Sequence, residues 1–211
     1  MNIDNFLIEN NLNDSFDILH VFETRLSEFF GSPYAVLTDC CTHAIELCLR
    51  LEPDSLVIPK QTYVSIPMTA IKLNLHFEFH NVEWTEFYQL KPNLYDAATL
   101  WRKNSYIPGS RMCISFQHKK HINIGRGGCI LLDDLGQYQT LKKMRYDGRN
   151  LDFKHHAKDN IDTIGYHYYM TPESALQGIE IFEKKKNMQP KIWTDQDYVD
   201  LSKLDVFKHY V

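Results

Sequence analysis

The sequence has no strong excess of charge of either sign and no long apolar run. Its 23 lysines and arginines oppose 27 aspartates and glutamates, for a net charge of −4. That balance gives no broad attraction to nucleic acid or to an anionic membrane, so any anion site has to be local. The first residues, MNIDNFLIENNLND, lack the basic stretch and apolar run of a signal peptide, and no segment is apolar for long enough to span a bilayer. We therefore expect a cytoplasmic globular protein.

Cysteine and histidine form no metal-binding pattern. The five cysteines are odd in number and include no C-x-x-C pair (Cys40, Cys41, Cys48, Cys113 and Cys129). Their expected state is reduced and mostly buried, and their spacing does not indicate zinc. His155, His156 and His167 lie in a polar stretch without metal-ligand spacing, so we interpret them as surface or loop residues and expect no metal.

The chain is organised around residues 112–134, MCISFQHKKHINIGRGGCILLDD. A short apolar strand at 112–116 is followed by a wide, glycine-rich loop and a second strand at 129–132. A loop of this kind presents side chains to a ligand, and it contains Lys119 and Lys120. Two interpretations of these lysines stay open. Each is a solvated ammonium, as most lysines are, or a partly desolvated amine that can form a Schiff base.

The first 80 residues alternate helix and strand. We expect helices at 15–30, 43–51 and 68–75, and strands at 34–38, 56–59 and 77–79. This order predicts a parallel sheet with helices on its faces. Ligands of such sheets bind beyond the carboxyl ends of the strands, where Thr42, Tyr63 and Lys120 would gather. The helix start near Cys41 and Thr42 either binds a phosphate through its backbone N–H groups or is merely capped by Thr42.

Asp96 follows a short strand at 94–95. A buried aspartate needs a partner that offsets its desolvation, so it either caps a following helix or holds a cationic ring nitrogen. The stretch at 80–93 has no clear period and is interpreted as a connection. Further helices are expected at 134–145 and from Thr171 to 186. We expect one domain over 1–186 and a short carboxyl-terminal tail over 187–211.

Five stretches, in order, resemble the motifs of the DegT/DnrJ/EryC1/StrS aminotransferases, pyridoxal-phosphate enzymes that aminate keto-sugars attached to nucleotides. The family's N-S-G-T-A-A-L resembles 39–45, P-x-x-T-F/Y resembles 59–63, E-D-A-A-Q resembles 95–99, S-F-x-x-x-K…G-E-G-G resembles 115–128, and G-Y-N-x-R-M-x-x-x-x-A resembles 165–175. The resemblance covers the chain from about residue 20 to residue 186.

The resemblance implies a role for each matched position. Lys120 would form the Schiff base with pyridoxal 5′-phosphate, and Asp96 would keep the ring nitrogen protonated. Lys119 is out of register. Tyr63 would stack on the ring. The remaining implied cofactor-binding residues are Cys41, Thr42, Thr99, Ser115 and His167. His167 stands where the family's asparagine reaches a neighbouring subunit's phosphate, which implies a homodimer with shared sites.

The resemblance also implies a fold and a reaction. The fold is a three-layer αβα domain with a mostly parallel sheet, the large domain of aspartate-aminotransferase-like (fold type I) transferases, with the small C-terminal domain largely missing. The reaction moves an amino group from glutamate to a keto group of a nucleotide-linked sugar. Two alternatives stay open: a non-catalytic descendant that binds the cofactor or a nucleotide-sugar, and a sugar dehydratase, whose relatives are expected to replace the lysine by histidine. Arg126, in place of the family glutamate, either binds a carboxylate or phosphate or is solvated.

Overall fold

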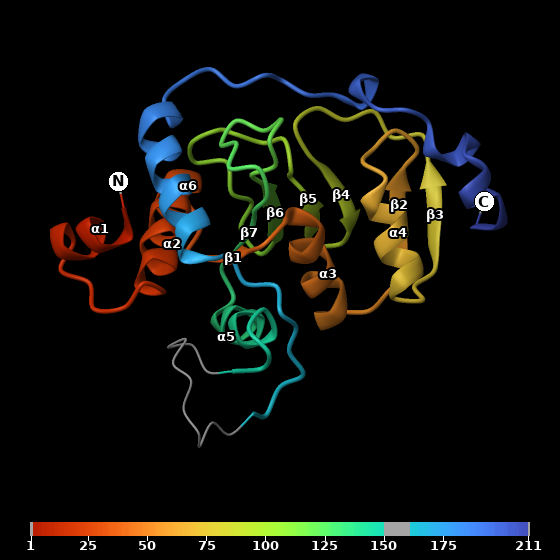
Figure 1. The fold of residues 1–211 in the computed structure, drawn as a ribbon. Helices are drawn as coiled ribbons and strands as arrows, with labels where there is room; N and C mark the ends of the chain where they lie inside the picture. Colours follow the sequence, from red (N-terminus) through yellow and green to blue (C-terminus); the bar gives the residue numbers. More distant parts are fainter. Residues whose placement is uncertain (1, 150–160, 211) are drawn as a thin grey trace.

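Seven strands and six α-helices make up the part of the chain that this computed structural model describes, residues 2–149 and 161–210 (Figure 1). The helices are α1 (Ile3–Glu9), α2 (Asp17–Phe30), α3 (Cys41–Leu51), α4 (Ser65–Lys72), α5 (Leu135–Met144) and α6 (Pro172–Lys185). The strands are β1 (Tyr34–Thr38), β2 (Leu56–Pro59), β3 (Phe77–His80), β4 (Tyr88–Lys91), β5 (Leu94–Asp96), β6 (Arg111–Ser115) and β7 (Gly128–Leu132). The predicted alternation of helix and strand from α2 to β3 is confirmed. His155 and His156 lie outside the described residues.

The sheet is mixed, which corrects the prediction of a mostly parallel one. Five strands lie in the order β1-β7-β6-β5-β4, and β2 and β3 form a separate parallel pair. The β5–β6 pairing is parallel, whereas β1–β7, β6–β7 and β4–β5 are antiparallel. The β6–β7 and β4–β5 pairings are antiparallel because residues 116–127 lead β6 directly back into β7, and because a tight reversal with Asn93 at φ 63° joins β4 to β5. The stretch at 80–93 is therefore more than a connection.

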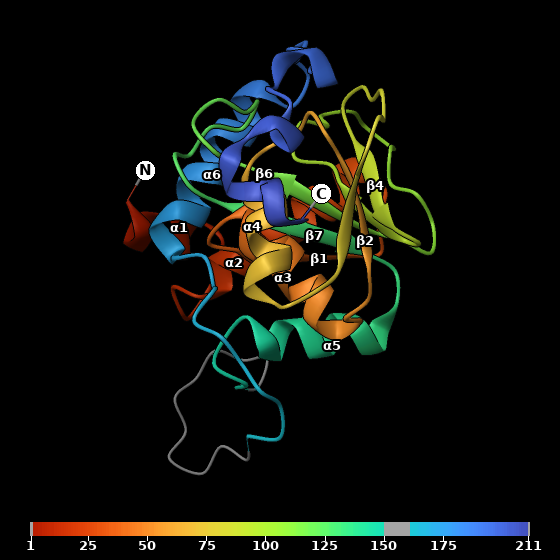
Figure 2. The same ribbon diagram turned by 90° about the vertical axis from the view of Figure 1, so that its right-hand side faces the viewer.

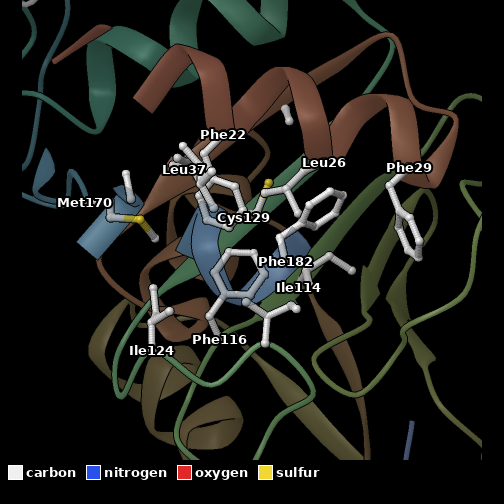
Figure 3. Packing of buried hydrophobic residues seen from close by; sticks show 14 of the residues in the cluster. Phe22, Leu26, Phe29, Leu37, Ile114, Phe116, Ile124, Cys129, Met170 and Phe182 are labelled. Atoms are coloured by element: carbon white, nitrogen blue, oxygen red, sulfur yellow. The ribbon is translucent and has the colours of Figure 1, made fainter. Parts of the chain in front are cut away.

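Successive residues of β6 and β7 point to opposite faces of the sheet, and a hydrophobic core lies on each face. Ile114, Cys129 and their neighbours on the same face pack against α2 and α6 (Figure 3). Cys113 and Ile130 point to the opposite face and pack with α3 and α5. Helix α5 lies below the strands in Figure 2. On the first face, Gly178 of α6 lets the two helices approach closely, since a Cβ there would lie 2.4 Å from the ring of Phe22. The three-layer architecture follows from this division.

A buried group of ions joins α2, β1 and α5. Glu23 on α2 accepts a hydrogen bond from the Leu37 backbone N–H at 2.9 Å and forms an ion pair with Arg145. Arg145 donates to the Leu37 carbonyl at 2.7 Å, and the Lys142 Nζ lies 3.5 Å from a Glu23 carboxylate oxygen. The side chains of Glu23 and Arg145 are 3% and 0% exposed. The cluster therefore holds both backbone groups of one β1 residue in the interior.

The carboxyl-terminal segment crosses over the sheet. After α6 it runs above the strands to the β2–β3 pair, where the chain ends (Figure 1). Three short 3-10 helices form along it, η1 (Asp195–Asp197), η2 (Leu201–Lys203) and η3 (Asp205–Tyr210). Within residues 2–149 and 161–210, no helix combines the length and the apolar character needed to cross a membrane.

Candidate active site

A cavity of about 600 Å³ lies beyond the carboxyl ends of β1, β5 and β6, where the sequence predicts a ligand. Its volume is within the usual range for a small-molecule site, roughly 300–1,000 Å³. Seven of the predicted site residues line it: Cys41, Thr42, Tyr63, Asp96, Thr99, Ser115 and Lys120. The motifs that are scattered along the sequence therefore meet in one place.

Lys120 projects from the loop between β6 and β7. A bond from its backbone N–H to the Gln117 carbonyl at 2.7 Å fixes the local turn. The side-chain Nζ lies 3.4 Å from the Tyr198 hydroxyl and 4.7 Å from the centre of the Trp193 ring. Burial lowers the pKa of Lys120 below its usual value of 10.5. Of the two interpretations of this lysine, the structure favours the partly desolvated amine.

Asp96 is the last residue of β5 and is 5% exposed. One carboxylate oxygen accepts from the Tyr88 hydroxyl at 2.6 Å, and the other accepts from the Ala98 backbone N–H at 2.9 Å. Burial raises the pKa of Asp96, and the bonds from Tyr88 and Ala98 oppose that rise. Burial also raises the pKa of Tyr88 well above its usual value, so this residue stays a hydroxyl donor. Asp96 thus accepts a hydrogen bond from the nearby backbone and also places a carboxylate on the cavity wall.

The start of α3 forms another wall. The helix begins at Cys41 with Cys40 as its N-cap, so of the two interpretations of this helix start, the one in which Thr42 caps it is wrong. The Thr42 hydroxyl bonds instead to the Ser65 hydroxyl at 2.9 Å. Gly128 lies against this helix start, because a Cβ there would be 2.5 Å from the Cys41 nitrogen. The first backbone N–H groups of an α-helix lack intrahelical acceptors and favour an anion, so this wall suits a phosphate.

A charged cluster forms the rim beside the start of α3. Asp39 bonds to the His43 ring at 2.6 Å and to the Arg126 guanidinium at 2.7 Å, which also lies 3.9 Å from the Cys40 sulfur. Arg126 is therefore paired rather than simply solvated. Asp39, Cys40 and His43 bring a carboxylate, a thiol and an imidazole within 4.8 Å of one another. The Arg126 cation on two of these ligand groups opposes a metal ion there.

The His43–Asp39 pair predicts a pH-dependent stability. Burial lowers the pKa of His43, but the bond to Asp39 and the neighbouring Cys40 thiol outweigh it and raise the pKa to about 9. Because this value lies above the usual 6.5, the contribution is complete below pH 6.5 and is lost as the pH rises through 9. We expect His43 to contribute about 1 kcal/mol to the free energy of unfolding at acidic pH, since the pair is partly solvated.

Urea denaturation on both sides of that window measures the effect. The difference in stability between wild type and His43→Gln should shrink as the pH rises, whereas His209→Gln, at an exposed position, should track the wild type throughout. A difference that stays constant over the whole window would show that the pair does not titrate as described.

Sequence reasoning missed the residues that close the cavity. Thr62, Tyr88, Trp193 and Tyr198 all line it. For Trp193 and Tyr198, the one signal in the sequence was the presence of aromatic residues in the carboxyl-terminal tail, and it does not indicate where the tail packs. His167 lies elsewhere, with its side chain 70% exposed and its ring 2.9 Å from Asp147. Its predicted role concerns a neighbouring subunit and stays a prediction.

Comparisons with known proteins agree with the predicted resemblance. Residues 107–191 match the sequence model of the DegT/DnrJ/EryC1/StrS aminotransferase family. The search of curated proteins found no match. Among solved structures, AtS13 from Actinomadura melliaura has a TM-score of 0.69 at 17% sequence identity, with 79% of this chain and 59% of that chain covered.

Two further structures have the same relation to the chain. The sugar aminotransferase CalS13 from Micromonospora echinospora gives a TM-score of 0.65 at 14% identity, covering 79% of this chain and 60% of its own. Helicobacter pylori PseC, an aminotransferase involved in the biosynthesis of pseudoaminic acid, gives 0.66 at 14%, covering 80% and 58%. The predicted three-layer fold of the large domain is thereby confirmed, with a mixed sheet in place of the mostly parallel one. The chain spans about three fifths of the length of these structures.

Proposed function

We propose that this chain is a pyridoxal-phosphate-dependent sugar aminotransferase that moves an amino group from glutamate to a keto group of a nucleotide-linked sugar. The observation that carries the proposal is the presence of the Lys120 amine and the Asp96 carboxylate on the walls of one cavity. A binding module needs neither group, whereas the reaction needs both. We further propose a cytoplasmic homodimer, in which His167 serves the partner's site.

The residues around the cavity suit the cofactor. Asp96 offers a buried carboxylate that could face a protonated ring nitrogen, and Lys120 offers an amine of lowered pKa. Tyr63, 52% exposed, presents a ring to the cavity. The start of α3 and Ser115 would hold the phosphate. Thr99 also lines the cavity, and its hydroxyl donates to the Glu86 carbonyl at 2.5 Å.

In the proposed reaction, the side chains of the protein would attach and orient the cofactor and would move protons. When bound, pyridoxal phosphate supplies an electron sink. Lys120 would attach the cofactor and, once displaced by the amino donor, accept and return a proton at its Nζ. Lowering the pKa of Lys120 keeps more of this amine neutral and able to accept. Asp96 would hold a proton on the ring nitrogen, and the carboxyl-terminal segment would limit access of water.

The structure gives less support to the two alternatives. A dehydratase would place a histidine where Lys120 stands. The nearest candidate, His121, instead bonds the Lys185 carbonyl at 2.8 Å and stacks on Trp101 with ring centres 5.3 Å apart. These two contacts hold its ring against Trp101 and the end of α6. A non-catalytic binder needs neither a buried carboxylate nor a desolvated amine on the walls of its cavity.

The half-reaction with glutamate tests the proposed function. Purified protein loaded with pyridoxal phosphate should release 2-oxoglutarate from glutamate, up to one molecule per chain. Asp96→Asn keeps the shape of the side chain but removes its charge, so we expect a rate about 10²-fold lower. A coupled assay for 2-oxoglutarate measures both.

Asp162→Asn is the control, because Asp162 is exposed and pairs with Lys143 far from the cavity. It should match the wild type. Release of no 2-oxoglutarate by loaded wild type would favour the non-catalytic alternative, and an unimpaired Asp96→Asn would refute the role of the carboxylate.

A further inference from the structure

The Lys120 amine meets two aromatic side chains of the carboxyl-terminal segment. The Tyr198 hydroxyl lies 3.4 Å from Nζ, and the Trp193 ring centre lies 4.7 Å from it. All three groups line the same cavity. The first contact is a hydrogen bond and the second a cation–π contact, so the amine is directed by groups from outside its own loop.

Backbone hydrogen bonds on both sides hold these two aromatic residues in place. Before Tyr198, the Glu86 N–H donates to the Trp193 carbonyl at 2.8 Å, and the Asp195 N–H donates to the Trp84 carbonyl at 3.2 Å. After it, the Leu201 N–H donates to the Lys60 carbonyl at 2.7 Å. The segment is thus anchored to the chain before β4 and to the chain after β2. Tyr198 lies between the two anchors, which limits the positions open to its hydroxyl.

The charged and titratable groups around Lys120 come from several elements. Asp96 on β5 and Cys41 on α3 face it, and Lys191 and Asp197 face it from the segment itself. Lys191 and Asp197 form an ion pair at 2.7 Å, so their opposite charges largely offset each other. Burial raises the pKa of Tyr198, which therefore remains a neutral hydroxyl in the range where lysine titrates. A neutral hydroxyl can donate to the lone pair of an amine or accept from an ammonium.

We propose that Tyr198 is a positioning residue that holds the Lys120 Nζ toward the cavity in both of its protonation states. The proposal rests on the proposed function, because it assigns the carboxyl-terminal segment a part in the reaction of Lys120 with an aldehyde. Tyr198 is a hydrogen-bond partner of the amine and takes no part in covalent chemistry. The Trp193 ring restricts the position of the Lys120 Nζ on a second side.

Labelling of the apo-protein with pyridoxal phosphate tests this. The aldehyde condenses with a neutral amine and releases water, and borohydride then reduces the product to a stable secondary amine. Peptide mass spectrometry gives the initial rate at Lys120 and, in the same chain, at Lys119, across the pH range. The variants are Tyr198→Phe and a matched control, Tyr210→Phe, in which the altered ring stacks on Phe77 instead.

Tyr198→Phe should lower the limiting rate at Lys120 at alkaline pH about threefold to tenfold, the usual effect of one hydrogen bond. The pH midpoint of labelling should also move down, because the lost hydroxyl stabilised the ammonium more strongly than the neutral amine. Lys119 should label at the wild-type rate, and circular dichroism should show that the variant is folded. Tyr210→Phe should leave both residues unchanged.

The outcomes separate the two proposals. A wild-type chain in which Lys120 is not labelled would overturn the proposed function and this inference with it. Labelling of Lys120 with the same limiting rate and midpoint in Tyr198→Phe would overturn the inference alone. An equal fall at Lys119 and Lys120 would also overturn it, since a general disturbance of the loop would then explain the loss.

Discussion

Replacing Lys120 by alanine should abolish the visible absorption of protein-bound pyridoxal phosphate and lower turnover by about 10²- to 10⁴-fold. The variant loses the amine that attaches the cofactor and the base that would move the proton. The side chain is only partly buried, so the substitution should leave the fold intact. Absorption spectra and the 2-oxoglutarate assay measure the two losses.

Lys119→Ala is the informative control, because it removes a lysine of the same loop. Lys119 is exposed, and its backbone N–H bonds the Gln117 side chain at 3.1 Å. The resemblance in sequence places the reactive amine at 120 and not at 119. Lys119→Ala should therefore keep the absorption band. If the band disappears in Lys119→Ala and persists in Lys120→Ala, the assignment is wrong by one residue.

Replacing Glu23 by alanine should lower the free energy of unfolding by about 3–5 kcal/mol. The variant leaves the buried charge of Arg145 and the nearby charge of Lys142 without the carboxylate that now compensates them. It also removes the acceptor of the Leu37 N–H on β1. Chemical denaturation followed by circular dichroism measures the change.

Glu183→Ala provides the comparison. Glu183 pairs with Arg25 and Lys186, but its side chain is 43% exposed, so its loss should cost less than about 1 kcal/mol. Burial raises the pKa of Glu23, but Arg145 and Lys142 outweigh it and the net pKa is below 4.5. The contribution of Glu23 is therefore present above pH 4.5 and is lost as the pH falls through the lower value in the folded protein. Equal losses in the two variants would contradict the account of the cluster.

The parts of the fold that the sequence predicts are those that local chemistry determines. The start of α6 follows from the Thr171 side chain, which accepts from the Ser174 N–H, and from Pro172 in its first turn. The sheet order and β4 were not predictable in the same way. β4 is set by pairing with β5 across a shifted register, and the intervening residues show no alternating pattern that would reveal it.

The candidate site also has residues that the sequence predicts and residues that it does not. Motifs placed Asp96, Lys120 and the start of α3 together, because each lies at or shortly after the carboxyl end of a strand whose direction is fixed by the fold. Trp193 and Tyr198 lie in the same cavity because their segment forms hydrogen bonds with residues more than a hundred positions earlier, through the backbone at 60 and 84–86 and through the Gln61 side chain. Such contacts depend on tertiary packing, and patterns among neighbouring residues of the sequence do not indicate them.

The identity of the amine that reacts with pyridoxal phosphate tests the central claim most directly. Wild-type protein is mixed with one equivalent of the aldehyde, reduced with borohydride, digested and analysed by mass spectrometry. Because the Lys120 amine lies in one cavity with the Asp96 carboxylate, we predict a single dominant adduct on the peptide that carries Lys120. Adducts spread over exposed lysines such as Lys119 and Lys203, with Lys120 unmodified, would contradict it.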